Sequence, residues 1–184
     1  MIKKKNIIGI CGSASQNSKN LSILNWISES NNSDFEMEII DNLTELPHFK
    51  TELTDKNVPK QIVDFRNKIK NSDGIVICTP EYVFSIPSCL KNMIEWCVST
   101  TVFSDKPIGI ITASASGEKG HEELKLIMKT IQTKFTNETT LLIQGIKGKI
   151  DKNGKIINKD TENRLRKLII SFNTLIEKPA GNNV

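Results

Sequence analysis

Short apolar runs alternate with longer amphipathic stretches along the whole chain. The apolar runs have the length and the β-branched composition of buried strands. The stretches between them place apolar residues three or four positions apart, as a helix with one buried face requires. The five expected strands cover residues 6–11, 35–40, 74–78, 107–112 and 139–143. Strands that alternate with helices in this way predict an α/β fold, with a parallel sheet covered by helices on both faces.

Each of the five expected helices shows its buried face as a stripe of apolar residues. The stripes are Leu21, Ile23, Leu24, Trp26 and Ile27; Val58, Ile62, Phe65 and Ile69; Leu90, Met93, Ile94 and Cys97; Leu124, Ile127, Met128, Ile131 and Phe135; and Leu165, Leu168, Ile169, Phe172 and Ile176. Pro87 falls in the first turn of the third helix, where proline is tolerated. The loop 41–57 is long for a compact domain, which suggests a functional role.

Composition places the chain among soluble globular proteins, because 38% of its residues are hydrophobic and 25% are charged. No apolar run approaches the ~18 residues of a membrane span. The net charge of +4 comes without a basic stripe interleaved with aromatics, which argues against nucleic-acid binding. We expect one domain over residues 1–177 and a flexible tail over 178–184. We also expect a cytoplasmic protein, since the residues after the lysines at 3–5 do not continue as a signal peptide.

Cysteine and histidine usage gives no sign of a metal site, because the chain contains no CxxC pair and no histidine cluster. The four cysteines are Cys11, Cys78, Cys89 and Cys97. We expect them to be buried, reduced thiols that behave as small hydrophobic residues. His48 and His121 have no carboxylate or serine at a telling spacing, so they are predicted to be surface or loop residues.

Polar residues crowd the loop that follows the first strand. They are Ser13, Ser15, Ser18, Lys19 and Asn20. Hydroxyl, amide and ammonium groups at the start of a helix favour an anion there. The spacing fits neither a Walker A loop nor a GxGxxG fingerprint, and a loop rich in hydroxyls suits a single phosphate monoester. Capping the helix requires only one such residue, whereas five are present.

A second unusual loop, 79–87, follows the third strand and contains the only tyrosine of the chain, Tyr82. Five parallel strands allow the flavodoxin-like order 2-1-3-4-5, in a three-layer sandwich whose ligand crevice opens beside the first and third strands. These are the strands that end in the two unusual loops. We therefore expect one composite site, in which the first loop holds an anion and the second borders a flat ring.

The two loops and the helix after them resemble the NADPH-dependent FMN reductase family, which includes chromate-, quinone- and azo-reducing flavoproteins. The residues that carry the resemblance are Gly12-Ser13 with Ser18 and Asn20, Thr79-Pro80-Glu81-Tyr82, Ser85-Ile86-Pro87, Leu90-Lys91-Asn92 and Glu95-Trp96. The resemblance implies FMN as the cofactor and NADPH or NADH as the hydride donor. It implies a small-molecule acceptor: a quinone, an azo compound, a metal oxyanion or free flavin.

The resemblance also assigns roles to residues. The residues expected to bind the FMN phosphate are Ser13, Ser18 and Asn20, with Ser15 and Lys19 in the same loop. Those expected to line the isoalloxazine ring and ribityl chain are Pro80, Glu81, Tyr82 and Val83, with Phe84 beside them. The third loop, 114–120, with Ser114 and Gly117, is expected to border the ring. No side chain is expected to act as nucleophile or general base, because the cofactor carries the chemistry.

Three departures from the family pattern stand out, and one of them is that the loop 114–120 has fewer glycines than is common. Ser15 replaces an arginine found in many members, which removes a charge-assisted bond to the phosphate. Val83-Phe84 replaces the common Asn-Gly pair, so the ring edge is expected to be more apolar. The family forms dimers, often tetramers. We expect a homodimer or homotetramer here, with the third helix and exposed Val83, Phe84 and Trp96 at the interface.

Two other classes of protein remain open. A flavodoxin-type electron carrier binds FMN without reacting with NADPH, but such carriers are usually strongly acidic and this chain is net basic. A phosphate-binding receiver module needs an acidic cluster at the strand ends to hold a metal, and this chain has serines there instead. A yellow colour on purification excludes the receiver module, and NADPH oxidation separates the reductase from the carrier.

Overall fold

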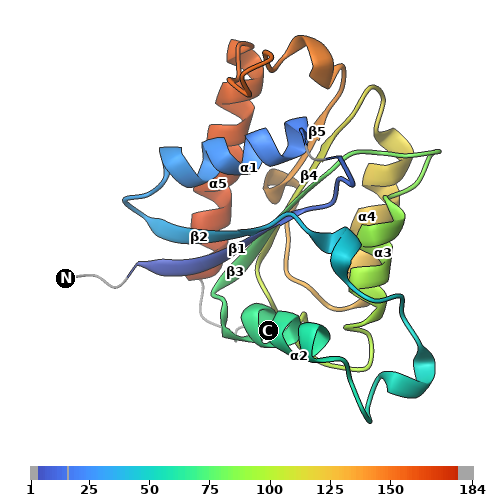
Figure 1. The fold of residues 1–184 in the computed structure, drawn as a ribbon. Helices are drawn as coiled ribbons and strands as arrows, with labels where there is room; N and C mark the ends of the chain where they lie inside the picture. Colours follow the sequence, from blue (N-terminus) through green and yellow to red (C-terminus); the bar gives the residue numbers. More distant parts are fainter. Residues whose placement is uncertain (1–3, 16, 178–184) are drawn as a thin grey trace.

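The computed structural model describes residues 4–15 and 17–177 (Figure 1). One parallel sheet has the strand order β2-β1-β3-β4-β5, which confirms the flavodoxin-like α/β order expected from the sequence. The strands are β1 (Lys5–Cys11), β2 (Phe35–Ile40), β3 (Gly74–Thr79), β4 (Ile108–Ala113) and β5 (Thr140–Ile143). The expected tail 178–184 lies outside the described residues.

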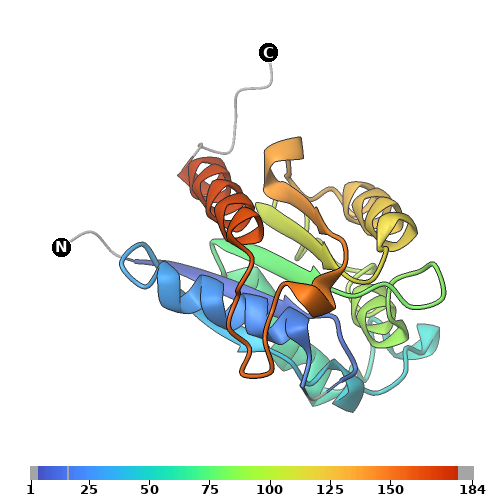
Figure 2. The ribbon, with the colours of Figure 1, turned by 90° about the horizontal axis from the view of Figure 1, so that it is seen from above.

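Helices cover both faces of the sheet and make a three-layer sandwich (Figures 1 and 2). On one face lie α1 (Lys19–Ser30) and α5 (Lys159–Glu177); on the other lie α2 (Lys60–Asn71), α3 (Ser88–Glu95) and α4 (Glu118–Thr130). Within the described residues, no helix is long and apolar enough to cross a membrane.

Strand residues contribute to two separate hydrophobic cores, one on each face of the sheet, because successive side chains of a strand point to opposite faces. Ile7 packs with α1 and α5, whereas Ile8 and Ile10 pack with the helices of the other face. Every residue of β3 and β4 is buried, as expected of central parallel strands. The edge strand β2 has exposed and half-buried residues between its buried ends, in agreement with its alternating sequence.

The end of α4 differs from the prediction, because Ile131 and Phe135 lie beyond the helix. Gln132 adopts a left-handed conformation with φ 63°, which ends the helical hydrogen-bond pattern. The Lys134 carbonyl then accepts a hydrogen bond of 2.9 Å from the amide of Ile108, at the start of β4. The periodic stripe continues past the helix because both apolar residues still pack against the core beyond the helix end.

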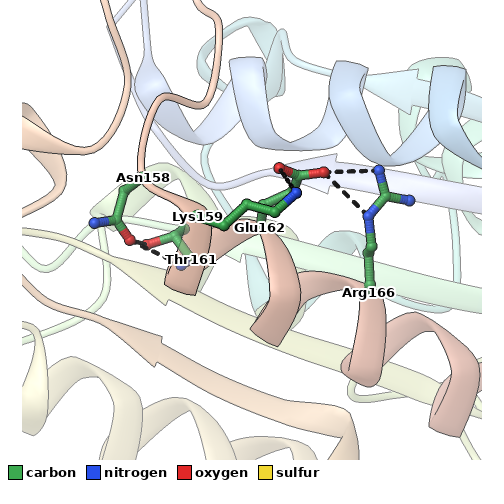
Figure 3. Close-up of polar contacts among 5 residues, drawn as sticks. All are labelled: Asn158, Lys159, Thr161, Glu162 and Arg166. Atoms are coloured by element: carbon green, nitrogen blue, oxygen red, sulfur yellow. Dashed lines mark hydrogen bonds and ion pairs between the residues drawn. The ribbon is translucent and has the colours of Figure 1, made fainter.

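The first turns of α5 are held by side chains on its own surface (Figure 3). The Asn158 side-chain oxygen accepts hydrogen bonds from the amide and hydroxyl of Thr161, both 2.8 Å, in the manner of a helix N-cap. Glu162 pairs with Arg166 at 2.8 Å. The Arg166 guanidinium lies 5.0 Å from the ring centre of Trp26 on α1, so this cluster links the two helices of one face.

The long loop 41–57 is fixed to the end of α3. The Pro47 carbonyl accepts hydrogen bonds from the Trp96 indole at 2.7 Å and the Asn92 amide at 3.1 Å. The Asn92 side-chain oxygen accepts from the Phe49 amide at 2.8 Å, and the Phe49 and Trp96 rings meet edge to face. Trp96 is fully buried. The prediction that Trp96 is an exposed interface residue was therefore wrong, because its indole is used to hold this loop.

Gly12 lies at a point where β1 and β3 leave no room for a side chain. Its amide donates to the Cys78 carbonyl at 2.9 Å, which continues the strand pairing beyond β1. A Cβ at this position would press against the Thr79 hydroxyl, 2.6 Å from the Thr79 Cβ and 2.9 Å from a methyl of Leu90. Only glycine allows the strand ends to approach so closely.

We predict that Gly12→Ala lowers the free energy of unfolding by about 1–3 kcal/mol, the usual cost of overpacking a closed core. The matched control is Gly148→Ala, because a Cβ at Gly148 meets nothing within 4 Å. Urea denaturation of both variants at pH 7 measures the difference. Equal stability of the two variants would show that the strand ends can separate at no cost.

Candidate functional site

Three loops meet at the carboxyl edge of the sheet. Loop 1 (residues 12–18), loop 2 (residues 80–87) and loop 3 (residues 114–117) follow β1, β3 and β4, which are neighbours in the sheet. The Ser13 hydroxyl lies 3.3 Å from the Tyr82 hydroxyl, and the Ser114 hydroxyl donates to the Glu81 carbonyl at 3.4 Å. The structure thus brings together residues that the sequence placed in three separate loops.

Loop 1 presents hydroxyl and amide groups at the start of α1. The Ser18 hydroxyl caps the helix by accepting from the Asn20 amide at 3.2 Å. The Ser13 hydroxyl accepts from the Ser15 amide at 3.2 Å, and the Ser15 side chain is exposed. The first turn of α1 contains no acidic residue. Such a helix start favours an anion, because its amide groups and its dipole both present positive charge.

Two residues that the sequence placed in the first loop, Lys19 and Asn20, lie in the first turn of α1, and their side chains are bonded elsewhere. The side-chain NH₂ group of the buried Asn20 donates to the Ala113 carbonyl at 3.3 Å. The side-chain oxygen of Asn20 accepts from the Cys78 thiol at 3.3 Å. Asn20 therefore ties α1 to the ends of β3 and β4. The Lys19 ammonium donates to the Asp151 carbonyl. Both side chains support loop 1, in which the Ser15 side chain is exposed and those of Ser13 and Ser18 are buried.

Loop 2 forms a tight hairpin with an apolar tip. Tyr82 and Ser85 exchange backbone hydrogen bonds of 2.9 and 3.0 Å. Between them, Val83 and Phe84 have φ of 51° and 59°, as in a type I′ turn. Their side chains are 94% and 76% exposed, and the hairpin projects from the body of the molecule in both views (Figures 1 and 2). The type I′ turn favours Asn-Gly, so this pair is strained as well as exposed.

The Glu81 carboxylate caps α4, a role that the sequence did not reveal. One oxygen accepts from the Gly117 amide at 3.2 Å and the other from the Gly120 amide at 2.8 Å. Gly117 occupies the N-cap position with φ 89° and has no side chain to offer. The helix begins at Glu118, so the expected loop 114–120 ends at residue 117 and Gly120 belongs to the first helical turn.

Glu123, one turn further along α4, binds the other limb of the hairpin. One of its oxygens accepts from the Ser85 hydroxyl at 2.7 Å and from the Ile86 amide at 3.0 Å. Sequence reasoning missed Glu123, because a single glutamate among several on a helix carries no signal of a distant partner. Loop 2 is thus fastened to α4 at both of its limbs.

His121 is neither a surface nor a loop residue, and that prediction was wrong. It lies on α4, half-buried, with its Nδ1 2.9 Å from the hydroxyl of Thr112 on β4. Burial lowers the pKa of His121 to about 4, and the nearby Lys125 ammonium lowers it too. The ring is therefore neutral at pH 7 and holds α4 against the sheet through Thr112.

Two hollows flank the site on the β2 side. One, of about 420 Å³, lies between the loop at 43–49 and α3. The other, of about 250 Å³, adjoins loop 1, and Asp41 and Glu45 form part of its wall. These carboxylates repel a phosphate from the second hollow. Ser13 and Ser15 of loop 1 also line this hollow, and the groups that favour an anion are the backbone amides at the start of α1.

The cysteines are free and buried, as predicted. Burial raises the pKa of Cys11 and of Cys78, and it raises that of Cys97 to about 12. The Cys89 thiol, whose pKa burial also raises, lies 3.6 Å from the Gly12 carbonyl. All four are protonated at pH 7, so they serve as packing groups. The described part of the chain contains no group of three residues able to hold a metal.

Comparison with known proteins decides the family. The model of the NADPH-dependent FMN reductase family matches residues 5–147. The chain belongs to this family. An NAD(P)H:quinone oxidoreductase of Solanum tuberosum is 28% identical to this chain over 184 residues, which cover 95% of this chain and 94% of the relative. A quinone reductase of Escherichia coli (strain K12) is 23% identical, over 97% of the chain and 98% of the relative.

Solved structures share the fold. FerB, a flavoenzyme NAD(P)H:(acceptor) oxidoreductase from Paracoccus denitrificans, superposes with a TM-score of 0.80 at 20% identity, over 94% of this chain and 97% of that one. A flavodoxin from the domain Archaea superposes with a TM-score of 0.60 at 16% identity, over 94% and 99%. Membership of the family makes this protein an oxidoreductase that uses FMN with NAD(P)H as electron donor.

The residues at the carboxyl edge fit FMN. Loop 1 offers hydroxyls and backbone amides for the phosphate, at a helix start without a carboxylate in its first turn. Loops 2 and 3 lie side by side, joined by the contacts of Glu81 with Ser114 and Gly117, where the ring is expected. The donor set matches the chemistry of a phosphate monoester joined to a flat ring.

We predict that the protein becomes less stable as the pH is lowered from 6.5 towards 4, because of His121. Its pKa is about 4 in the folded state against 6.5 unfolded, so below pH 6.5 the unfolded state takes up a proton first. The stabilisation is complete above pH 6.5 and is lost as the pH falls towards 4. It amounts to about 2–3 kcal/mol, less than the full pKa difference implies, because the half-exposed ring is partly screened by solvent. Urea denaturation between pH 7.5 and 4 should show a smaller decline in His121→Asn, and identical declines would contradict this assignment.

Proposed function

We propose that this protein transfers electrons from NAD(P)H to a quinone, through FMN held by loops 1, 2 and 3. The observation that carries the proposal is the meeting of loops 1 and 2, where the Ser13 and Tyr82 hydroxyls are 3.3 Å apart. Support also comes from relatives named as quinone oxidoreductases and quinone reductases that match this chain over nearly its whole length.

In this proposal the hydroxyls of Ser13, Ser15 and Ser18 and the first amides of α1 hold the phosphate. Pro80 and Tyr82 border the ring from loop 2, with Ser114 opposite in loop 3. When bound, FMN supplies the chemistry by accepting a hydride from the reduced nicotinamide and returning electrons to the acceptor. The chain itself binds, orients and excludes water, and none of its side chains is assigned as nucleophile or general base.

The decisive assay follows NAD(P)H oxidation by the FMN-loaded protein with a quinone as acceptor. Turnover supports the proposal. A protein that binds FMN but does not oxidise NADH or NADPH would instead be an electron carrier of the flavodoxin type. Comparing the two nicotinamides in the same assay gives the donor preference.

We predict that FMN binds more tightly than riboflavin, and that Ser18→Ala removes most of this difference. A lost hydrogen bond to a charged phosphate costs about 1.5–3 kcal/mol, or roughly ten- to a hundredfold in affinity. The matched control is Ser22→Ala, on the next turn of α1, where the hydroxyl bonds only within the helix at 3.4 Å. Asn20→Ala should also weaken FMN binding, by releasing α1 from the ends of β3 and β4.

Titration by flavin fluorescence quenching measures these affinities. Riboflavin should bind all the variants of loop 1 equally, because it lacks the phosphate. Wild-type protein that binds riboflavin as tightly as FMN would remove the phosphate site from the proposal. A Ser18→Ala variant with wild-type FMN affinity would restrict Ser18 to its capping role.

The apolar tip of loop 2 bears on acceptor choice and on assembly. An exposed Val83-Phe84 pair beside the ring would favour flat aromatic acceptors, such as quinones, over small charged ones. Azo compounds, metal oxyanions and free flavin are the other acceptors to compare. The same exposure suits a contact with a second subunit, so we also infer a homodimer or homotetramer.

We predict that Phe84→Gly and Phe84→Ala both lower the ratio of quinone to metal-oxyanion reduction, since both remove the aromatic ring. Only the glycine variant should gain stability, because glycine adopts φ 59° without strain. It should exceed the alanine variant by about 1 kcal/mol in free energy of unfolding. Steady-state rates at saturating NADPH and urea denaturation give the two readouts. Unchanged activity ratios in both variants would assign Phe84 to a subunit contact.

A further inference from the structure

We propose that Glu81 and Glu123 are positioning residues, which together clamp the hairpin at residues 82–85 to α4 and so set the spacing between loops 1 and 2. The proposal rests on the function proposed above, because the spacing matters to a ring bound between these loops. The clamp itself is a property of the chain and can be tested without a flavin.

The Glu81 half of the clamp joins loop 2 to the start of α4. Both carboxylate oxygens are used, one by the Gly117 amide and one by the Gly120 amide. The negative charge lies at the positive end of the helix dipole, where it is stabilised. A Cβ at Gly120 would lie 3.2 Å from Cβ and Cγ of Glu81 and 3.4 Å from the Ser85 carbonyl oxygen, so the base of the hairpin packs directly on the helix.

The Glu123 half runs in the opposite direction, from α4 to loop 2. A single oxygen accepts both from the Ser85 hydroxyl at 2.7 Å and from the Ile86 amide at 3.0 Å. The two carboxylates therefore attach the two limbs of one hairpin to α4 by hydrogen bonds. Two attachments on opposite limbs fix the direction of the hairpin as well as its distance from the helix.

The hairpin needs such support because its own turn is unfavourable. Val83 and Phe84 both have positive φ, and neither side chain packs against the molecule. Any rotation of the hairpin moves Tyr82, whose hydroxyl is 3.3 Å from that of Ser13 in loop 1. The clamp on α4 thereby sets the gap between the loops on the other side of the hairpin.

The neighbouring carboxylate of Glu122 on α4 provides the matched control for Glu123. Glu122 pairs with the exposed Lys119 at 3.0 Å. Replacing Glu122 removes the same charge from the same turn as replacing Glu123, without touching loop 2. Glu122→Gln is therefore expected to leave the hairpin and the activity within twofold of wild type.

The clamp predicts a different response to glutamine at its two ends. Glu81→Gln should release the hairpin and lower the activity. Glutamine has one oxygen for two amides and turns an NH₂ group towards the other donor. Glu123→Ala should release the hairpin and lower the activity as well. Glu123→Gln should keep most of the activity, since a single oxygen accepts both hydrogen bonds, from the Ser85 hydroxyl and the Ile86 amide. Loss of charge alone would affect Glu81→Gln and Glu123→Gln equally.

The first readout is amide exchange of Tyr82 in protein without flavin. Tyr82 is the only tyrosine, so ¹⁵N-tyrosine labelling gives one assigned backbone NMR signal. Its amide donates to the Ser85 carbonyl at 2.9 Å and should be protected. We expect exchange to rise at least about tenfold in Glu81→Gln and Glu123→Ala. Unchanged exchange in both variants would overturn the clamp.

The second readout is steady-state kinetics with FMN bound. We expect Glu81→Gln and Glu123→Ala to lower kcat about tenfold, because misplaced reactants react slowly. The FMN dissociation constant should stay within about threefold, because loop 1 holds the phosphate. Faster exchange of Tyr82 with unchanged kcat would overturn the positioning role. Wild-type protein that does not oxidise NAD(P)H would overturn the proposed function instead, while the exchange data would still decide the clamp.

Discussion

The close approach of Gly12 to Thr79 is the contact on which the site depends. No side chain fits between them, since a Cβ at Gly12 would lie 2.6 Å from the Thr79 Cβ. The Gly12 amide extends the pairing of β1 with β3 through the Cys78 carbonyl, so the strands stay together beyond the end of β1. Because loops 1 and 2 leave from these strand ends, their separation is set before either loop forms a contact of its own.

The start of α4 shows how a helix end can serve a neighbouring loop. The first amides of a helix lack intrahelical partners, and a serine or aspartate at the N-cap usually satisfies one of them. Gly117 cannot do so, and the Glu81 carboxylate takes its place from another loop. The same hydrogen bonds then stabilise the helix and locate loop 2. A local cap at position 117 would satisfy the helix and leave loop 2 unattached, so the missing side chain favours the longer connection.

The sequence predicts the sheet, its order and the meeting of the three loops at one edge, because these depend on local patterns. Strand and helix periodicities alternate, and parallel strands bring their carboxyl ends to one edge. It predicts side-chain partners poorly, because these are remote along the chain. Asn20 bonds to Ala113, 93 positions away, and the stripe that contains Trp96 could not distinguish a core from a subunit interface. The left-handed φ of Val83 and Phe84 was also hidden, since both residue types usually avoid it.

The tip of loop 2 is unfavourable by every measure that applies to the isolated chain. A left-handed conformation costs a residue with a Cβ about 1–3 kcal/mol, and two such residues weigh heavily against a typical stability of about 5–15 kcal/mol. Exposure of Val83 and Phe84 brings no compensating burial. The hydrogen bonds of Glu81 and Glu123 hold the hairpin in place, but they would hold an Asn-Gly turn equally well, because they bind its limbs and not its tip. An exposed apolar tip of this kind would gain from the contact with an acceptor or with a second subunit that is proposed above.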